Sequence, residues 1–210
     1  MRAMSDTATG TVRHTLQTAP PPPAPGAERY VALDFANSDL ALPGGQELDL
    51  LGSPALATEW LVGRGLAPAG AVLQEVCAGR LREHRNQVRA LLSSQINALP
   101  APAEALRAIN DALTSVPSAP LLRWDEAQGL HRAQPHPTDQ VLDRALALLA
   151  ADAAELLTGA DAERLAACGS SPCRRFLLRT HAARHWCSVR CGDRARAARA
   201  YARRTRPEAK

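Results

Sequence analysis

The chain has 210 residues, which suits one ordinary domain with a smaller unit beside it. Hydrophobic residues make up 46% of it but aromatic residues only 3%, so we expect a core built mostly from Leu, Ala and Val, and the formal net charge is +4. No apolar run approaches the length of a membrane span, and the first residues contain no apolar signal segment, so we expect a cytoplasmic protein without a membrane partner.

Residues 1–27 end in a proline-rich stretch that cannot bury a core. This composition predicts a disordered arm. In the segment that follows, Val31, Leu33 and Phe35 alternate with other residues. This alternation predicts a short strand, with a helical turn as the alternative.

Helical patterns dominate residues 28–160, which we expect to form a helical domain. Ser53 and Pro54 are typical of a helix start, and Gly63 of its end. Apolar residues recur at three-to-four spacing over 69–98 and predict one long helix. Cys77 lies on its apolar side, as a small buried side chain would.

Further patterns complete this domain. A helix is predicted up to about Val116, and another over 138–158 with Gly159 as its end. Between them, 121–124 and 130–134 flank a polar turn and predict a β-hairpin. His131 and His136 beside it lack further ligands at suitable spacing, so we expect loop histidines. The fold class is therefore mainly α (α+β).

Four cysteines fall within 24 residues, in the pattern Cys168-x4-Cys173, thirteen residues, then Cys187-x3-Cys191. Two close pairs are typical of a structural zinc site with four thiolates and no open position. So short a segment needs a metal to fold, so we predict one structural Zn2+. The alternatives are two disulfides, four unrelated thiols, or a ligand set in which His181 or His185 replaces a cysteine.

The end of the chain is strongly basic. Residues 168–210 hold eleven Arg and one Lys against Asp193 and Glu208, a net +10, while the preceding 167 residues carry −6. This asymmetry favours a polyanionic partner. Residues 193–205 predict a helix rich in Ala and Arg. On a helical wheel one side of it is an arginine stripe: Arg196, Arg199, Arg203 and Arg206.

Arg194 falls on the opposite side of this helix, where the helix can dock on the cysteine-containing segment. We nevertheless include Arg194 with the arginine stripe among the candidate nucleic-acid contacts. Arginine side chains suit both phosphate oxygens and guanine edges, and the stripe does not distinguish between these two kinds of contact, so it predicts a polyanionic partner.

Short motifs at both ends of residues 30–206 carry a family resemblance. Trp186-Cys187-Ser188 followed by Cys191-Gly192-Asp193-Arg194 resembles the signature of the CGNR zinc finger, with Asp193 in place of Asn. Leu33-Asp34-Phe35-Ala36-Asn37 resembles the opening of the ABATE domain. The resemblance implies membership of a bacterial family described as stress-induced transcription regulators, in which the finger is the DNA-binding part, so we expect double-stranded DNA as the partner. It also implies 28–160 as the ABATE domain and 161–210 as the finger and its helix.

Two other function classes remain open. A zinc-stabilised module that binds RNA or protein, with a helical domain that senses a small effector, fits the same pattern. An enzyme is disfavoured because no nucleophile–base pair, P-loop or dinucleotide motif occurs. Asp34 and Asn37 could line a small-molecule pocket, although capping is their commoner use. The oligomeric state is not predicted.

Overall fold

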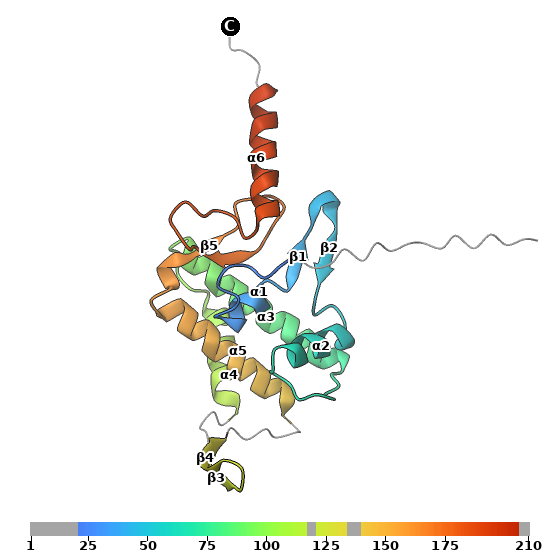
Figure 1. Cartoon of the computed structure of the whole chain (residues 1–210), viewed down its shortest axis with the longest axis vertical. Coiled ribbons are helices and arrows are strands. Elements are labelled where there is room, and N and C mark those ends of the chain that lie inside the picture. The colour runs from blue at the N-terminus through green and yellow to red at the C-terminus, as the bar shows by residue number, and fades with distance from the viewer. Residues whose placement is uncertain (1–20, 117–120, 134–139, 206–210) are drawn as a thin grey trace, which may run out of the picture.

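The computed structural model describes residues 21–116, 121–133 and 140–205. Over these residues the protein is mostly helical, with three small two-stranded sheets (Figure 1). Three long helices lie along one another and form the core of the body: α3 (Glu75–Ile96), α4 (Ala103–Ser115) and α5 (Val141–Thr158). Two shorter helices complete it: α1 (Val31–Ala36) packs on α3 and α5, and α2 (Pro54–Gly63) packs on α3. We call residues 28–160 the helical body.

The apolar spacing of these helices explains their packing. Leu142, Leu149 and Leu156 of α5 recur at seven-residue spacing and are all buried. Ser53 caps α2 as predicted, because its hydroxyl accepts the backbone N–H of Leu56. The long helix α3 begins at Glu75 rather than near residue 69, since Gly70, with φ of 89°, lies in a turn before it.

The strand predicted near residue 31 was wrong, because Val31–Ala36 is the helix α1. The alternating pattern of Val31, Leu33 and Phe35 left out the apolar alanines Ala32 and Ala36. Ala32 and Ala36 are as fully buried as Leu33 and Phe35, so this short helix is enclosed on more than one side. Small residues let α1 approach α3 and α5 closely.

Two hairpins project from the helical body. The first joins β1 (Asp39–Ala41) to β2 (Glu47–Asp49) through a 3-10 turn (Pro43–Gly45). The sequence patterns did not predict it. Arg85 of α3 anchors its base, because its guanidinium donates to both carboxylate oxygens of Asp49. The hairpin therefore has a fixed position beside the C-terminal part of the chain.

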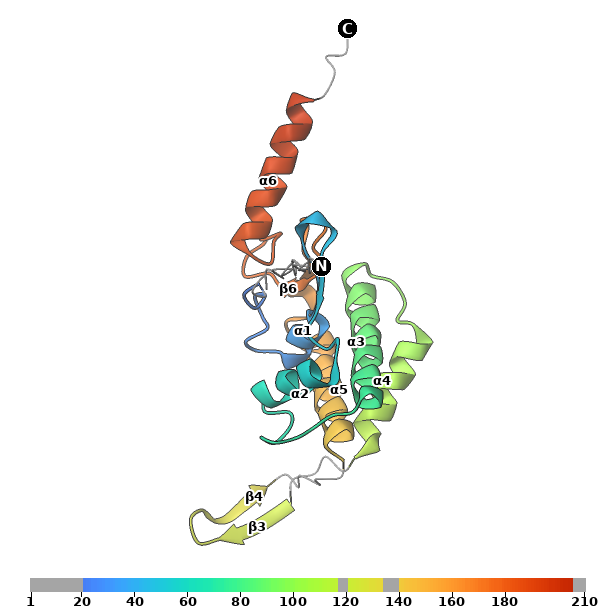
Figure 2. The same ribbon diagram turned by 90° about the vertical axis from the view of Figure 1, so that its right-hand side faces the viewer.

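The second hairpin is the predicted one, β3 (Leu121–Asp125) with β4 (Gly129–Ala133). It lies at the end of the molecule opposite α6 (Val189–Arg204), as Figures 1 and 2 both show. Leu122, Trp124 and Leu130 are each about two-thirds exposed on it. His131 follows Leu130 in β4 and is partly exposed, whereas His136 is outside the described residues.

The end of the proline-rich arm is ordered, which its composition did not predict. Residues 21–27 lie against the C-terminal part of the chain: Ala24 and Gly26 are buried, and Pro25 accepts the backbone N–H of Leu178. Residues 1–20 are outside the described residues. Among the helices that the structure describes, none is long and apolar enough to cross a membrane.

Candidate metal centre and basic helix

The first cysteine pair lies on a loop between two short strands, β5 (Leu165–Ala167) and β6 (Phe176–Leu178). Ala167 pairs with Phe176 in this antiparallel sheet, which brings Cys168 and Cys173 to the same end. The backbone N–H of Cys168 donates to the carbonyl of Arg175 at 2.8 Å and closes the loop. We call residues 161–205 the cysteine module.

The second pair lies at the beginning of helix α6. Ser188 is its N-cap, and the Ser188 hydroxyl accepts the backbone N–H of Cys191 at 3.2 Å. The helix therefore begins at Val189, four residues before the start predicted at Asp193, because the Ser188 hydroxyl caps it there. As a result Cys187 precedes the helix and Cys191 lies in its first turn, so the thiols fix the direction of α6.

The four cysteines form one compact cluster. Their sulfur atoms all lie within 4.8 Å of one another, and none of the five cysteines forms a disulfide. The Sγ atom of Cys187 lies 3.7 Å from that of Cys173 and 3.6 Å from that of Cys191. A zinc ion about 2.3 Å from four tetrahedral sulfurs separates them by about 3.8 Å, so this donor set fits a Zn2+ ion.

Hydrogen-bond donors surround the cluster, as thiolates require. Arg175 approaches the sulfur of Cys187 at 3.8 Å, and Arg194 approaches that of Cys191 at 3.3 Å. The backbone N–H of Cys187 points at the sulfur of Cys168 at 3.5 Å. These donors offset part of the negative charge that four thiolates would bring to a site with three buried cysteines.

The thiols also perturb one another when no cation is present. Hydrogen bonds from Cys173 and then Cys187 lower the pKa of Cys168 to about 2. The hydrogen bonds that Cys173 and Cys187 make to Cys168 raise the pKa of Cys173 to about 11 and also raise the pKa of Cys187. A cation that favours all four thiolates at once removes this conflict.

The histidines near the cluster are not part of it. Both His181 and His185 are exposed, and the cluster consists of the four cysteines. His185 instead lies edge-on to Trp186, with ring centroids 6.0 Å apart. Cys77, the fifth cysteine, packs against the core of the helical body but is half-buried rather than fully buried as predicted.

Trp186 organises the base of helix α6. The guanidinium carbons of Arg196 and Arg199 lie 5.7 and 5.5 Å from the centroid of its ring. Gly192 faces the same ring, and a Cβ atom there would come within 3.3 Å of Trp186. The sequence places Gly192 inside a motif but gives no reason for it; the structure shows that the glycine leaves room for the indole.

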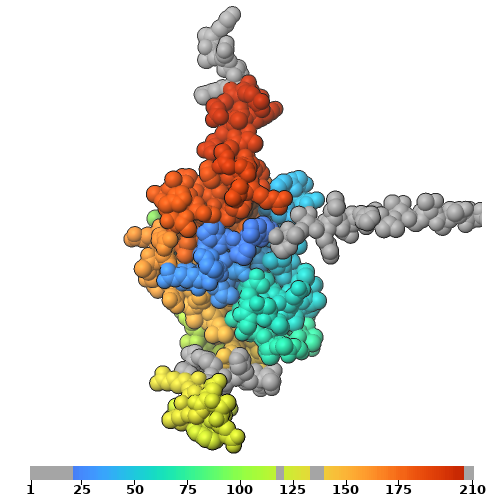
Figure 3. All heavy atoms as spheres, in the orientation of Figure 1, coloured from blue at the N-terminus to red at the C-terminus, as the bar shows by residue number. Residues whose placement is uncertain are grey.

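Beyond its base, α6 stands clear of the rest of the molecule (Figure 3). It carries six arginines against one acidic residue, Asp193. Arg199 and Arg203 are exposed, and so is Arg196, which pairs with Asp193 one turn before it. The stripe predicted from the helical wheel is therefore on the surface over its described part, while Arg206 is outside the described residues.

Arg194 has a different environment from the stripe. Its guanidinium donates to the carbonyls of Ser171 at 2.9 Å and Ser170 at 3.1 Å, as well as to the sulfur of Cys191. These contacts tie α6 to the loop that carries the first cysteine pair. Arg194 thus lies inside the cysteine module, on the side that the helical wheel assigned to docking.

A buried asparagine joins the cysteine module to the helical body. Asn37, at the end of α1, donates to the carbonyl of Phe176 at 2.9 Å and accepts its N–H at 2.7 Å. Asn37 is only 3% exposed. It is a helix C-cap, as its residue type favours, but the contact across 139 positions was not predicted. Since β6 lies directly after Cys173 and Arg174–Arg175, Asn37 holds the cysteine loop in place.

Two arginines reinforce this junction. Arg89 of α3 donates to the carbonyls of Ala36 and Arg174, and its guanidinium carbon lies 5.0 Å from the centroid of the Phe176 ring. Arg174 in turn forms ion pairs with Asp39 and Glu47 of the first hairpin. The cysteine module is therefore anchored to α1, α3 and the β1–β2 hairpin together.

Comparison with family models now gives the chain a place among known proteins. Residues 30–160 match the ABATE family, described as "Putative stress-induced transcription regulator". The chain belongs to the ABATE family. Residues 164–204 match the CGNR zinc finger, so the four cysteines and α6 lie within an ABATE protein's zinc finger. No curated protein matches the chain.

Within this ABATE protein, the motif residues now have observed contacts. Asn37 of the ABATE opening binds the finger, and Asp34 forms an ion pair with Arg64 of the turn after α2. Cys191, Gly192 and Arg194 of the finger signature lie at the sulfur cluster, against Trp186 and against the cysteine loop, respectively. Asp193, which replaces the signature asparagine, is exposed.

Proposed function

We propose that this ABATE protein is a cytoplasmic DNA-binding transcription regulator and that its cysteine module presents helix α6 to double-stranded DNA. The observation that carries the proposal is the exposed arginine side of α6, on a helix whose first turn is fixed by the cysteine cluster. A rigid helix with arginines on one side can follow phosphates or enter a major groove. The family description as a transcription regulator supports the same reading.

In this proposal Cys168, Cys173, Cys187 and Cys191 hold one structural Zn2+. The ion supplies folding energy, because the module's own apolar cluster is small and consists largely of the cysteines with Ala24, Ala166 and Leu177. The contacts with DNA are assigned to Arg196, Arg199, Arg203 and Arg206. Arg194 is assigned a supporting role, since its guanidinium is engaged with Ser170, Ser171 and Cys191.

Asp193 limits what the helix can recognise. Its carboxylate lies at the beginning of α6 and pairs with Arg196, which neutralises one charge of the stripe. A carboxylate also repels phosphate and lacks the amide donor of asparagine. We therefore expect phosphate contacts from Arg199 and Arg203 to supply most of the affinity.

Salt dependence of binding to a random-sequence 30-base-pair duplex tests the proposal. Arg199→Ala with Arg203→Ala should weaken binding and reduce the slope of log K against log salt by about 0.9 for each lost phosphate contact. Arg107→Ala with Arg123→Ala removes the same charge from exposed sites on α4 and β3 and should leave the slope unchanged. If the wild-type protein shows no salt-dependent binding to any duplex, the proposal that the arginines of α6 contact DNA phosphates fails.

The same measurement separates the alternative partners. Structured RNA and an acidic protein, added as competitors to the duplex, should displace it poorly if DNA is the preferred polyanion. Arg196 and Arg199 already occupy positions over the Trp186 ring, so this ring has little surface left for stacking on an unpaired base. This arrangement favours a duplex over single strands.

A further inference from the structure

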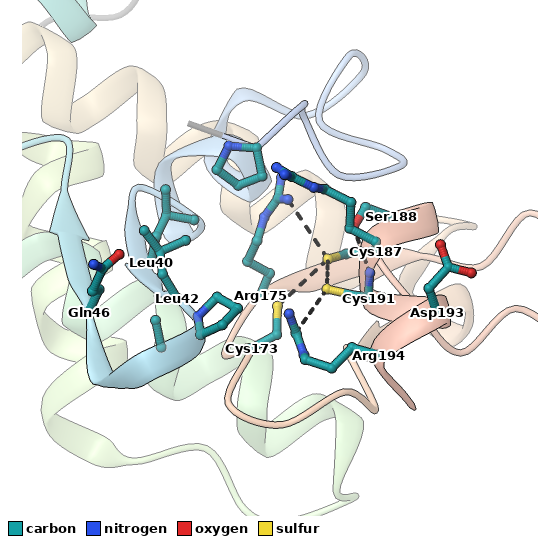
Figure 4. Close-up of a pocket in the computed structure, with 14 residues that line it drawn as sticks. Leu40, Leu42, Gln46, Cys173, Arg175, Cys187, Ser188, Cys191, Asp193 and Arg194 are labelled. Atoms are coloured by element: carbon teal, nitrogen blue, oxygen red, sulfur yellow. Dashed lines mark hydrogen bonds between the residues drawn. The ribbon is translucent and has the colours of Figure 1, made fainter. Parts of the chain in front are cut away.

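A groove lies between the β1–β2 hairpin and the cysteine module. Its volume is about 530 Å3. Leu40, Leu42 and Gln46 line it from the hairpin side, facing the cysteines across the opening (Figure 4). Cys173, Cys187 and Cys191 form part of the opposite wall, whereas Cys168 is not among the lining residues. The groove is large enough for small molecules to reach this side of the sulfur cluster.

The four sulfurs differ in how well they are protected. Cys168, Cys187 and Cys191 are 9%, 2% and 6% exposed, while Cys173 is only half-buried. Guanidinium groups of Arg175 and Arg194 reach the sulfurs of Cys187 and Cys191. Cys173 receives the backbone N–H of Arg175 in their place. Access decides which of four metal-bound thiolates an oxidant reaches first, and Cys173 is the least buried of the four, so we expect it to react first.

A resolving partner lies beside it. The sulfur of Cys187 is 3.7 Å from that of Cys173, and both line the groove. From these contacts we propose that Cys173 is an oxidation site for hydrogen peroxide, which enters through the groove, and that Cys187 converts the oxidised Cys173 to a disulfide.

The chemistry balances with peroxide as the oxidant. The Cys173 thiolate attacks one peroxide oxygen; an S–O bond forms, the O–O bond breaks, and hydroxide leaves and takes up a proton. The Cys187 thiolate then attacks the Cys173 sulfur; an S–S bond forms, the S–O bond breaks, and a second hydroxide leaves as water. Two thiolates lose two electrons in total, and one peroxide with two protons becomes two waters.

Oxidation would have a direct structural consequence. Only Cys168 and Cys191 remain as thiolates, so the site loses two of its four ligands and releases its zinc. Cys187 directly precedes the N-cap Ser188, so α6 also loses its fixed direction. The loss of DNA binding that follows rests on the proposed function, whereas zinc release and the disulfide do not.

The test is peroxide treatment of the zinc-loaded full-length chain. Zinc release is followed with a chromogenic chelator, and disulfides are mapped by mass spectrometry of proteolytic fragments. We expect one zinc released per chain, together with a Cys173–Cys187 disulfide. Zinc that stays bound under excess peroxide, or a disulfide that does not contain Cys173, would overturn the proposal.

Variants that narrow the groove test the route. Gln46→Trp and Ala41→Trp add bulk from the hairpin side and touch no sulfur, and we expect either one to slow zinc release by about threefold or more. Gln128→Trp, at an exposed turn of the distant β3–β4 hairpin, is the matched control and should react like the wild type. Equal rates in all four proteins would show that peroxide does not use the groove.

Discussion

Replacing Asn37, which lies in the helical body, should destabilise the cysteine module that it contacts. In Asn37→Ala, the buried N–H and carbonyl of Phe176 lose both partners. Each unpaired buried group costs about 1–3 kcal/mol, so we expect the free energy of unfolding to fall by roughly 3 kcal/mol, allowing for some entry of water. Because β6 follows the cysteine loop, the affinity for zinc should fall as well.

Denaturant unfolding of the zinc-loaded protein and titration against a competing chelator measure the two effects. Asn110→Ala is the control, since Asn110 is exposed on α4 and its removal should be nearly neutral or slightly stabilising. Asn37→Asp tests the direction of the bonds, because a carboxylate can accept from Phe176 N–H but cannot donate to its carbonyl. If Asn37→Ala unfolds within about 0.5 kcal/mol of the wild type, the junction does not contribute as argued.

Three further substitutions give separate tests. Arg194→Ala should lower the affinity for zinc about tenfold in chelator competition, because Arg194 supports the metal ligands. The salt slope of DNA binding should stay the same. An unchanged affinity for zinc would contradict the supporting role of Arg194. Gly192→Ala should destabilise the protein by about 1 kcal/mol in denaturant unfolding, because the added Cβ atom would lie 3.3 Å from Trp186. Gly79→Ala in α3 is the control and should stabilise the protein, because only Arg82, at 3.8 Å, is near the added Cβ atom. A similar gain in the free energy of unfolding from both substitutions would disprove the Trp186 contact. Burial, with a smaller effect of Arg80, lowers the pKa of His84 to about 4 from 6.5. The unfolded chain therefore takes up this proton first, and stability should fall by about 2 kcal/mol between pH 6.5 and 5. In saturating zinc, His84→Leu should reduce this loss of stability with falling pH. Parallel curves of stability against pH for the wild type and His84→Leu would refute the assignment to His84.

Local patterns in the sequence predicted the larger elements well. Repeated apolar spacing identified α5, and Ser53 with Pro54 identified the start of α2, because each signal lies within the element itself. The spacing of the four cysteines predicted that they would come together, since paired cysteines on short loops can meet at one point.

The elements that sequence patterns missed depend on distant contacts. Strands β5 and β6 have three residues each, too few to show a period, and exist because the cysteine loop joins them. The burial of Ala24 and Gly26 depends on Leu178 and its neighbours, far along the chain. Asn37 belongs to a recognisable motif, but nothing in that motif indicates that its partner is the backbone of Phe176.

Binding of duplex DNA by the zinc-loaded protein and by Cys187→Ser tests the central claim most directly. Selection from a pool of random duplexes should retain DNA on the wild-type protein, and Cys187→Ser, which lacks one metal ligand, should retain little or none. Equal retention by both proteins would show that the cysteine cluster does not direct α6. Failure of the wild type to retain any duplex would contradict DNA binding itself.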